Sequence, residues 1–365
     1  MEKLMGKIVF FIGLFTVLCF CAPESNACTG VTLKAKDGSY IFGRTLEFAQ
    51  NLESEVIVIP RNMEFDGVTP TGKNGLQWKS KFAATGANFN DTPVIVDGIN
   101  EKGLSSGIFY FPGFADYQSV IEGDIPRTIA PWQLVTWILT NFESVSEVKE
   151  KLKEIKVANV VFKKWNMVIP VHFIVTDAKG NSIVIEYIKG QLNIHDNEYG
   201  VITNSPPFDW MTTNIRNYLR LSPNNLIGKT VNGKNLTPFG EGSGMFGVPG
   251  DFTPPSRFIR GLFFSIASLT GNNSQDASMQ VFHILNNFDI PEGTVRSEKG
   301  KVTAYDRTQW TSVHDLNKKK YYYKTEGNTR IRVVKLLNCN LSAENILKLT
   351  METPEDIQDV TSDLK

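Results

Sequence analysis

The sequence predicts an α+β sandwich of antiparallel sheets, and two features of its apolar pattern support this prediction. Strand-like runs occur in groups joined by short turns, as hairpins and meanders require. Pairs of helix-like segments separate these groups, whereas a doubly wound parallel sheet alternates single strands with single helices. The chain has 365 residues, of which 41% are hydrophobic and 21% charged, so it is long enough for one large domain or two smaller ones.

The N-terminal half is predicted to begin with a β-hairpin, because two short alternating runs flank the turn at Lys36, Asp37 and Gly38. Further along, Ser144 is followed three residues later by Glu147, which is typical of a helix N-terminus. The elements predicted in this half are a hairpin over 31–45, a strand over 56–60, a reversal over 97–104 and helices over 131–142 and 144–156.

The C-terminal half is predicted to contain two meanders with a helix pair between them. The segment 221–250 is rich in Gly, Asn and Pro and is predicted to be a long surface loop. The run 318–324, made of lysines and tyrosines, is predicted to be an exposed hairpin. The elements predicted in this half are strands over 168–177, 182–189, 192–196 and 201–204, helices over 255–269 and 275–287, and a meander over 303–337.

Composition and spacing exclude several classes of function. The 38 basic and 38 acidic side chains balance, whereas a nucleic-acid-binding protein needs a basic excess to meet phosphate. No HxxxH or CxxC spacing occurs, so neither a metal site nor another cofactor is predicted. The glycine-rich run 240–244 lacks the Lys-Ser/Thr ending of a phosphate-binding loop, and we interpret it as a flexible loop.

The first 27 residues are predicted to be a cleavable signal peptide. A basic start precedes an apolar run over 8–21, which is too short for a comfortable membrane span. Ser25 and Ala27 supply the small residues that signal peptidase requires before a cut. Cleavage after Ala27 predicts a periplasmic or secreted chain over 28–365 without stable membrane insertion. The alternative is an uncleaved membrane anchor.

Cleavage at this point makes Cys28 the first residue of the mature chain. Cys19 and Cys21 leave with the signal peptide, and only Cys28 and Cys339 remain, so there is no disulfide framework, although one disulfide stays possible. The α-amino group of an N-terminal cysteine lies close enough to take the thiol proton, directly or through a water. Nucleophile and base then share one residue, and no catalytic histidine is needed.

Five blocks of sequence resemble the choloylglycine hydrolase family, which contains bile salt hydrolases and penicillin V acylases within the N-terminal nucleophile hydrolase superfamily. The resemblance implies one catalytic domain over 28–365 with the four-layer αββα sandwich of that superfamily, and it makes a homotetramer one candidate assembly. The blocks are Cys28-Thr29-Gly30 with Asp37-Gly38 and Phe42-Gly43-Arg44, then 97–104, Thr203-Asn204-Ser205-Pro206, 249–258, and Thr308-Gln309-Trp310-Thr311-Ser312.

The resemblance also implies a catalytic role for each of five residues. Cys28 is the nucleophile, and Arg44 is a fixed cation that favours its thiolate. Asn204 donates its side-chain amide to the oxyanion, and Arg257 matches the family's second active-site arginine. Glu47 stands where many members carry aspartate, and its charge can hold the α-ammonium group. Without the motif, the two arginines are interpreted as surface residues and Asn204 as a turn residue.

Tyr110 bears on the choice of substrate. Bile salt hydrolases tend to have asparagine at this position and penicillin V acylases tyrosine, so Tyr110 favours substrate binding of the second kind. The alternative is an aromatic side chain that only packs a strand. Five aromatic residues are predicted to crowd the edge of an acyl pocket, and they are Phe109, Tyr110, Phe111, Phe114 and Tyr117.

The predicted activity is hydrolysis of a linear carbon–nitrogen amide bond in a small-molecule substrate. The acyl part is expected to be bulky and apolar, as in penicillin V or a conjugated bile acid. An N-acyl homoserine lactone is an alternative substrate. A catalytically silent exported binding protein of the same fold is the alternative from another functional class.

Overall fold

The computed structural model describes residues 27–299 and 302–364, and two antiparallel sheets form its centre. The first sheet has the strand order β16 (Val201–Ile202), β1 (Cys28–Lys34), β2 (Tyr40–Glu47), β21 (Thr308–Asp315), β22 (Lys320–Thr325) and β23 (Asn328–Lys335). The second has the order β15 (Gln191–Asp196), β14 (Ser182–Ile188), β13 (Val171–Thr176), β8 (Ser105–Tyr110), β7 (Asp97–Asn100), β6 (Ala84–Ala87), β3 (Glu55–Ile59) and β24 (Leu347–Thr350).

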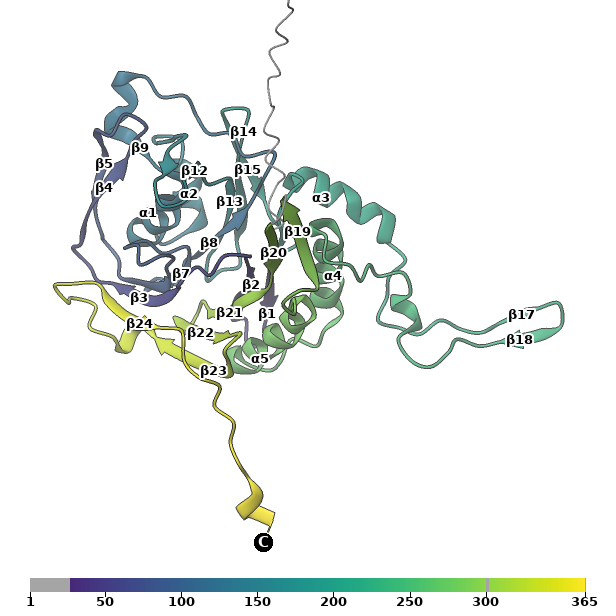
Figure 1. Ribbon diagram of the computed structural model, residues 1–365. Helices are drawn as coiled ribbons and strands as arrows, with labels where there is room; N and C mark the ends of the chain where they lie inside the picture. Colours follow the sequence, from purple (N-terminus) through teal and green to yellow (C-terminus); the bar gives the residue numbers. More distant parts are fainter. Residues whose placement is uncertain (1–26, 300–301, 365) are drawn as a thin grey trace, which may run out of the picture.

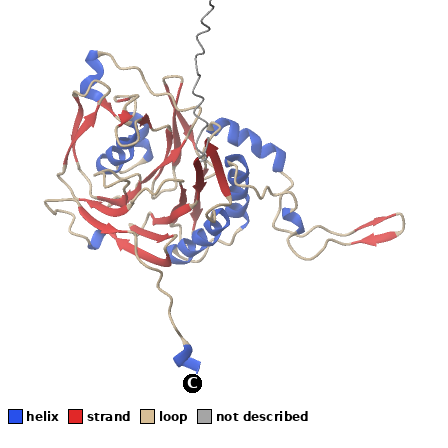
Figure 2. Cartoon of the chain, viewed as in Figure 1, coloured by secondary structure: helices blue, strands red, loops and turns tan. Residues whose placement is uncertain are grey.

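Helices cover the outer faces of the two sheets (Figures 1 and 2). Helices α4 (Pro254–Ala267) and α5 (Ser274–Leu285) lie on the first sheet, while α1 (Leu134–Asn141) packs on the second with α2 (Val145–Lys151) beside it. Close packing needs a glycine at Gly43, where a Cβ would stand 2.5 Å from Val281 on α5. The layers run helix, sheet, sheet, helix, so the predicted αββα sandwich is confirmed.

The predicted N-terminal hairpin is present as β1 and β2. The turn between them needs a positive φ at Gly38, which is +88°, and the Asp37 side chain accepts a hydrogen bond from the backbone N–H of Ser39 at 2.9 Å. The register pairs Gly30 with Arg44. The far end of β2 therefore returns to the first residues of β1.

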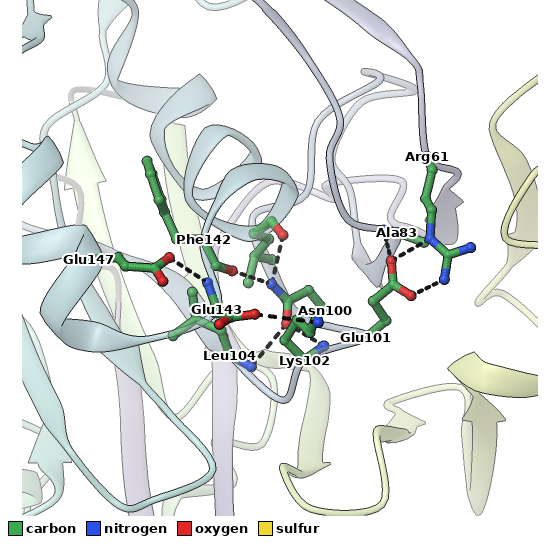
Figure 3. A network of polar contacts seen from close by, with 10 residues as sticks. Arg61, Ala83, Asn100, Glu101, Lys102, Leu104, Phe142, Glu143 and Glu147 are labelled. Atoms are coloured by element: carbon green, nitrogen blue, oxygen red, sulfur yellow. Dashed lines mark hydrogen bonds and ion pairs between the residues drawn. The ribbon is translucent and has the colours of Figure 1, made fainter.

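The predicted reversal over 97–104 is the turn between β7 and β8, and Asn100 fastens it (Figure 3). Its side-chain oxygen accepts from the N–H groups of Lys102 and Leu104, each at 3.0 Å. Its amide nitrogen donates to the carbonyls of Leu139 at 2.8 Å and Phe142 at 2.7 Å, at the end of α1. This block of the sequence therefore joins a turn of the second sheet to its covering helix.

The remaining elements lie at the edges of the sandwich. The β17–β18 hairpin projects from the body (Figure 1). Among the described residues, no helix has the length and apolar character needed to cross a membrane. The elements at the edges of the sandwich are the helix α3 (Phe208–Asn214) and five two-stranded ribbons: β4 (Glu64–Val68) with β5 (Asn74–Lys79), β9 (Thr128–Ile129) with β10 (Lys156–Val157), β11 (Val161–Phe162) with β12 (Met167–Val168), β17 (Lys229–Val231) with β18 (Lys234–Leu236), and β19 (Val295–Lys299) with β20 (Val302–Asp306).

Several predicted elements differ in detail from the structure. The helix predicted over 144–156 begins as expected, with the Ser144 side chain accepting from Glu147 N–H, but it ends at Lys151. The run 318–324 is not an exposed hairpin, because β22 lies between two strands and its three tyrosines are buried. The loop predicted over 221–250 carries the β17–β18 hairpin. The predicted signal peptide lies outside the described residues, except for Ala27.

Candidate active site

The fold brings the six predicted site residues into one region between the two sheets. Cys28 begins β1, Arg44 and Glu47 lie on β2, and Tyr110 ends β8 of the second sheet. Two further residues approach from other segments: Asn204 follows β16, and Arg257 lies in the first turn of α4. Hydrogen bonds or a shared cavity connect all six.

Cys28 is buried, with 4% of its surface exposed, and it lines a cavity. Burial raises the pKa of its thiol, because an apolar environment disfavours the thiolate. The cations of Arg44 and Arg257 act in the opposite direction and lower the pKa of this thiol. The site therefore contains two fixed positive charges that partly offset the burial of a thiolate, while the charge of Glu47 acts with burial and raises the pKa.

Arg257 is fully buried and holds the start of β1 in place. One terminal nitrogen donates to the Cys28 carbonyl and, at 2.8 Å, to the hydroxyl of Thr29. The other donates to the side-chain oxygen of Asn204 at 2.6 Å. Burial lowers the pKa of Arg257 to about 10, so the guanidinium stays charged at neutral pH.

The side-chain oxygen and nitrogen of Asn204 form hydrogen bonds with different partners. The oxygen accepts from the backbone N–H of Cys28 at 2.8 Å and from Arg257. The nitrogen donates one of its two hydrogens to the Tyr110 carbonyl at 2.8 Å. No acceptor for the second hydrogen is found among the described residues, which leaves it for another acceptor such as the oxyanion of a tetrahedral intermediate.

Arg44 is held between the sheets. Its guanidinium lies over the ring of Phe109 at 4.1 Å, and it donates to the backbone carbonyls of Thr45 and Ile108. Asp97 is buried close to it, and contacts with His314 and Ser312 together with the charge of Arg44 hold the pKa of this carboxyl below its ordinary value despite the opposing effect of burial. These contacts fix the arginine beside the thiol.

Glu47 is buried opposite Ala27, and its backbone N–H donates to the Ala27 carbonyl at 2.9 Å. One carboxylate oxygen accepts from the Thr308 hydroxyl at 3.1 Å, while the other has no hydrogen-bond partner among the described residues. Burial raises the pKa of this carboxyl from 4.5 to about 7. The charges of Arg257 and Arg44 lower this pKa but do not overcome burial, and a free α-ammonium on Cys28 would add a further cation.

The pKa of Glu47 gives a prediction for a chain in which Ala27 is still attached to Cys28. A carboxyl with a raised folded-state pKa costs no stability below about pH 4.5, and the cost grows as pH rises towards about 7. We expect the free energy of unfolding to fall over this range by up to about 3 kcal/mol. Urea unfolding at pH 4.5 and pH 7.5 measures this fall.

Glu47→Gln should remove most of this pH dependence, whereas Glu198→Gln, at an exposed position, should leave it unchanged. A chain that begins at Cys28 should show a smaller fall than the chain that retains Ala27, because its ammonium group favours the carboxylate. An equal fall in the Glu47→Gln variant would mean that another group causes it.

The cavity beside Cys28 is apolar and contains about 70 Å³ of free space. Phe48 stacks on Trp165 with ring centroids 5.5 Å apart and an interplanar angle of 18°, and it meets the edge of Tyr110 at 6.1 Å. The lining residues are Cys28, Arg44, Leu46, Glu47, Phe48, Leu52, Phe89, Val96, Ile108, Tyr110, Trp132, Trp165, Ile169 and Val171.

The sequence prediction of the aromatic pocket was largely wrong. Of the five aromatic residues predicted at its edge, only Tyr110 lines the cavity. The other aromatic lining residues are Phe48, Phe89, Trp132 and Trp165, which come from four separate segments. No local spacing in the sequence connects these segments, so only the fold reveals them.

His172 is a further residue beside the site, and no motif in the sequence indicated it. Its ring stacks on Phe111 at 4.3 Å, and one ring nitrogen lies 2.9 Å from the carbonyl of Thr203, next to Asn204. The other nitrogen lies 3.1 Å from buried Glu186. The histidine is structural, and the segment that it supports carries the predicted oxyanion donor.

Comparison with known proteins agrees with the fold and with the sequence blocks. The family model "Linear amide C-N hydrolases, choloylglycine hydrolase family" matches residues 28–359. A bile salt hydrolase/transferase of Clostridium perfringens is 37% identical over 320 residues, which cover 87% of this chain and 95% of the relative. A penicillin V acylase of Pectobacterium atrosepticum is 24% identical over 349 residues, covering 87% of this chain and 83% of the relative.

A crystal structure of conjugated bile acid hydrolase from Clostridium perfringens superposes with a TM-score of 0.81 at 35% sequence identity. The alignment covers 92% of this chain and all of the solved chain. These matches confirm the resemblance that was inferred from the five sequence blocks.

Proposed function

The chain belongs to the choloylglycine hydrolase family and is a hydrolase of linear carbon–nitrogen amide bonds, and we propose that it is an exported cysteine amidase that prefers flat aromatic acyl groups. The observation that carries the proposal is the apolar cavity that Cys28 shares with Tyr110 and the stacked pair Phe48 and Trp165. Penicillin V, with its phenoxyacetyl group, is the substrate of this kind that we put first.

In the proposed mechanism the freed α-amino group of Cys28 takes the thiol proton, and the thiolate attacks the amide carbonyl. The remaining N–H of Asn204 donates to the oxyanion as it forms. The intermediate then collapses to a thioester, and the leaving amine takes the proton from the α-ammonium group. Water hydrolyses the thioester, with the same amino group as the base, and restores the thiol.

Three charged side chains support this sequence of steps. Arg44 and Arg257 stabilise the thiolate, because both lower the pKa of the Cys28 thiol. Glu47 offers a buried carboxylate oxygen without a hydrogen-bond partner among the described residues, and it lines the same cavity as Cys28. The oxygen of Asn204 already accepts from the nitrogen of Cys28 and can orient the amino group.

The size of the cavity favours a slim acyl group. Its free space of about 70 Å³ is far below the roughly 300–1,000 Å³ of sites that enclose drug-sized ligands. A flat ring can slide between aromatic side chains with little rearrangement, whereas a steroid needs the cavity to widen. A conjugated bile acid remains the second candidate, because the relative from Clostridium perfringens is a bile salt hydrolase/transferase.

A panel of substrates tests the preference, and Tyr110 variants test its cause. Wild type is expected to show a higher kcat/KM for penicillin V than for glycocholate, taurocholate or acyl-homoserine lactones. Tyr110→Asn should lower the ratio of kcat/KM for penicillin V to that for glycocholate by about 3- to 10-fold, because an aromatic contact worth about 0.5–1.5 kcal/mol is lost. Tyr110→Phe keeps the ring and should change the ratio by less than about fivefold.

Phe114→Asn is the matched control, because Phe114 is a neighbouring aromatic residue that is exposed and lies outside the cavity lining. For this variant the ratio of kcat/KM for penicillin V to kcat/KM for glycocholate should equal that of wild type. This ratio does not depend on the fraction of enzyme that is active. A ratio that stays constant across all variants would show that Tyr110 does not determine the preference.

Export is proposed on the sequence of the first 27 residues, where a basic start, an apolar run and small residues at 25 and 27 precede Cys28. The mechanism needs the same cut, because the base is the amino group that cleavage releases. N-terminal sequencing of protein recovered from the periplasm or the medium should begin Cys-Thr-Gly. Fully active enzyme that still starts at Met1 would contradict both export processing and the proposed base.

A further inference from the structure

We propose that Gln309 is a positioning residue that sets the width of the acyl cavity from outside, by holding the loop 48–52 in one shape. The proposal rests on the proposed function in one respect, namely that the cavity beside Cys28 receives the acyl group. Gln309 does not line the cavity itself. It acts through Phe48 and Leu52, which do.

The side chain of Gln309 is committed entirely to this loop. Its amide nitrogen donates to the carbonyls of Phe48 at 2.9 Å and Gln50 at 2.6 Å. Its amide oxygen accepts from the N–H of Leu52 at 3.1 Å. Both donor hydrogens are used, and the side chain is 8% exposed, so little water competes for these bonds.

Gln309 holds the part of the loop that has left the sheet. The two ends of the loop have backbone hydrogen bonds of their own, from Phe48 N–H to the Arg307 carbonyl at 3.2 Å and from Asn90 N–H to the Leu52 carbonyl at 2.7 Å. The pairing of β2 with β21 ends at Glu47 and Thr308 with a register shift, and regular pairing resumes only at β3. Arg307 adds a hydrogen bond to the Ala49 carbonyl at 3.2 Å. The amide of Gln309 thus supplies the loop with hydrogen bonds that a neighbouring strand would otherwise make.

The loop forms one wall of the cavity beside Cys28. Phe48 stacks on Trp165 and meets the edge of Tyr110, so a shift of the loop changes the space between these rings. The hydrogen bonds of Cys28 and Asn204 with each other, with Arg257 and with Tyr110 do not involve the loop. Altering Gln309 is therefore expected to affect acyl binding and to leave the reactivity of the thiol intact.

The test compares Gln309→Glu with wild type on the acyl substrate that wild type hydrolyses best. A carboxylate keeps the length of the side chain but turns an acceptor towards two carbonyls, which repels the loop. KM is expected to rise by about tenfold or more, while kcat changes by less than about threefold. The rate at which iodoacetamide alkylates Cys28 should stay within about twofold of wild type, because this small probe does not need the acyl cavity.

Gln309→Met is the second variant, because it keeps the volume without any charge and can be measured if Gln309→Glu does not fold. Gln50→Ala is the matched control, since it removes an exposed side chain of the same loop but keeps the carbonyl that Gln309 binds. The control should keep the wild-type KM. A wild-type KM in a folded Gln309 variant would overturn the proposal, and so would equal losses in kcat and alkylation rate without a change in KM.

The outcome also separates this proposal from the substrate preference. If wild type hydrolyses glycocholate best, the preference for flat aromatic acyl groups fails, and the effect of Gln309 on KM is then measured with glycocholate. If no acyl amide is hydrolysed by wild type that begins at Cys28, the proposed function itself fails. A wild-type enzyme with a clear preference and a Gln309 variant with unchanged KM contradicts the role of Gln309 alone.

Discussion

Cys28→Ser is expected to fold as wild type and to lose at least about a thousandfold in kcat, since removing a covalent nucleophile has effects of this size or larger. A serine hydroxyl is far less acidic than a thiol, so the α-amino group that we propose as the base is too weak to deprotonate it. The cations of Arg44 and Arg257 partly offset the burial of a thiolate. They are not enough to ionise a hydroxyl. The measurement is kcat on protein that begins at residue 28, with the melting temperature as the check on folding.

Cys339→Ser is the control for this variant. Cys339 is partly exposed, its sulfur lies 3.7 Å from the Lys335 carbonyl, and it does not line the cavity. Its replacement should leave kcat within about twofold of wild type, as expected for a surface position. A thiol titration should find one reactive cysteine in each single variant. Substantial turnover by the Cys28→Ser variant would place the nucleophile elsewhere.

The local part of the site could be predicted from the sequence because it lies within one hairpin. The turn at Gly38 fixes the pairing of β1 with β2, and pairing of Gly30 with Arg44 brings an arginine beside Cys28. Short connections leave few alternative registers. Local sequence patterns also predicted the helices α4 and α5, and each predicted end lies within two residues of the observed one.

The long-range part of the site could not be predicted in this way. The short strand before Asn204 pairs with β1 in the first sheet, although the three strands before it belong to the second. A strand of two residues has too little pattern to specify its partner. The cavity wall could not be predicted either. Phe48 and Trp165 are more than a hundred residues apart in the sequence, and no periodicity indicates their contact.

The role of Gln309 could not be predicted, although Gln309 lies in a block of sequence that resembles the family. The resemblance included Thr308-Gln309-Trp310, but it assigned no contact to the glutamine. In the structure its amide nitrogen donates to the carbonyls of Phe48 and Gln50, and its oxygen accepts from the N–H of Leu52. Such a role depends on where the backbone leaves the sheet, and that point is set by the register shift after Leu46.

Asn204→Asp is expected to lower kcat by about 10²- to 10³-fold, the usual cost of removing one oxyanion donor. The variant keeps the size of the side chain and an oxygen for the nitrogen of Cys28 and for Arg257. Its second oxygen, however, replaces the nitrogen that donates to the Tyr110 carbonyl at 2.8 Å, and it has no hydrogen for the oxyanion. The added negative charge also disfavours the thiolate of Cys28.

Ser205→Ala separates the loss of the donor from a general disturbance of this turn. The Ser205 hydroxyl donates to the Pro112 carbonyl at 2.7 Å, so the control removes a hydrogen bond between the same two segments without touching the oxyanion. Its kcat should stay within about threefold of wild type. The decisive comparison is kcat at a pH high enough to ionise the thiol in every variant. Recovery of Asn204→Asp under that condition would assign its defect to the charge and place the oxyanion donor on another group, whereas a loss that persists at high pH is what a missing donor requires.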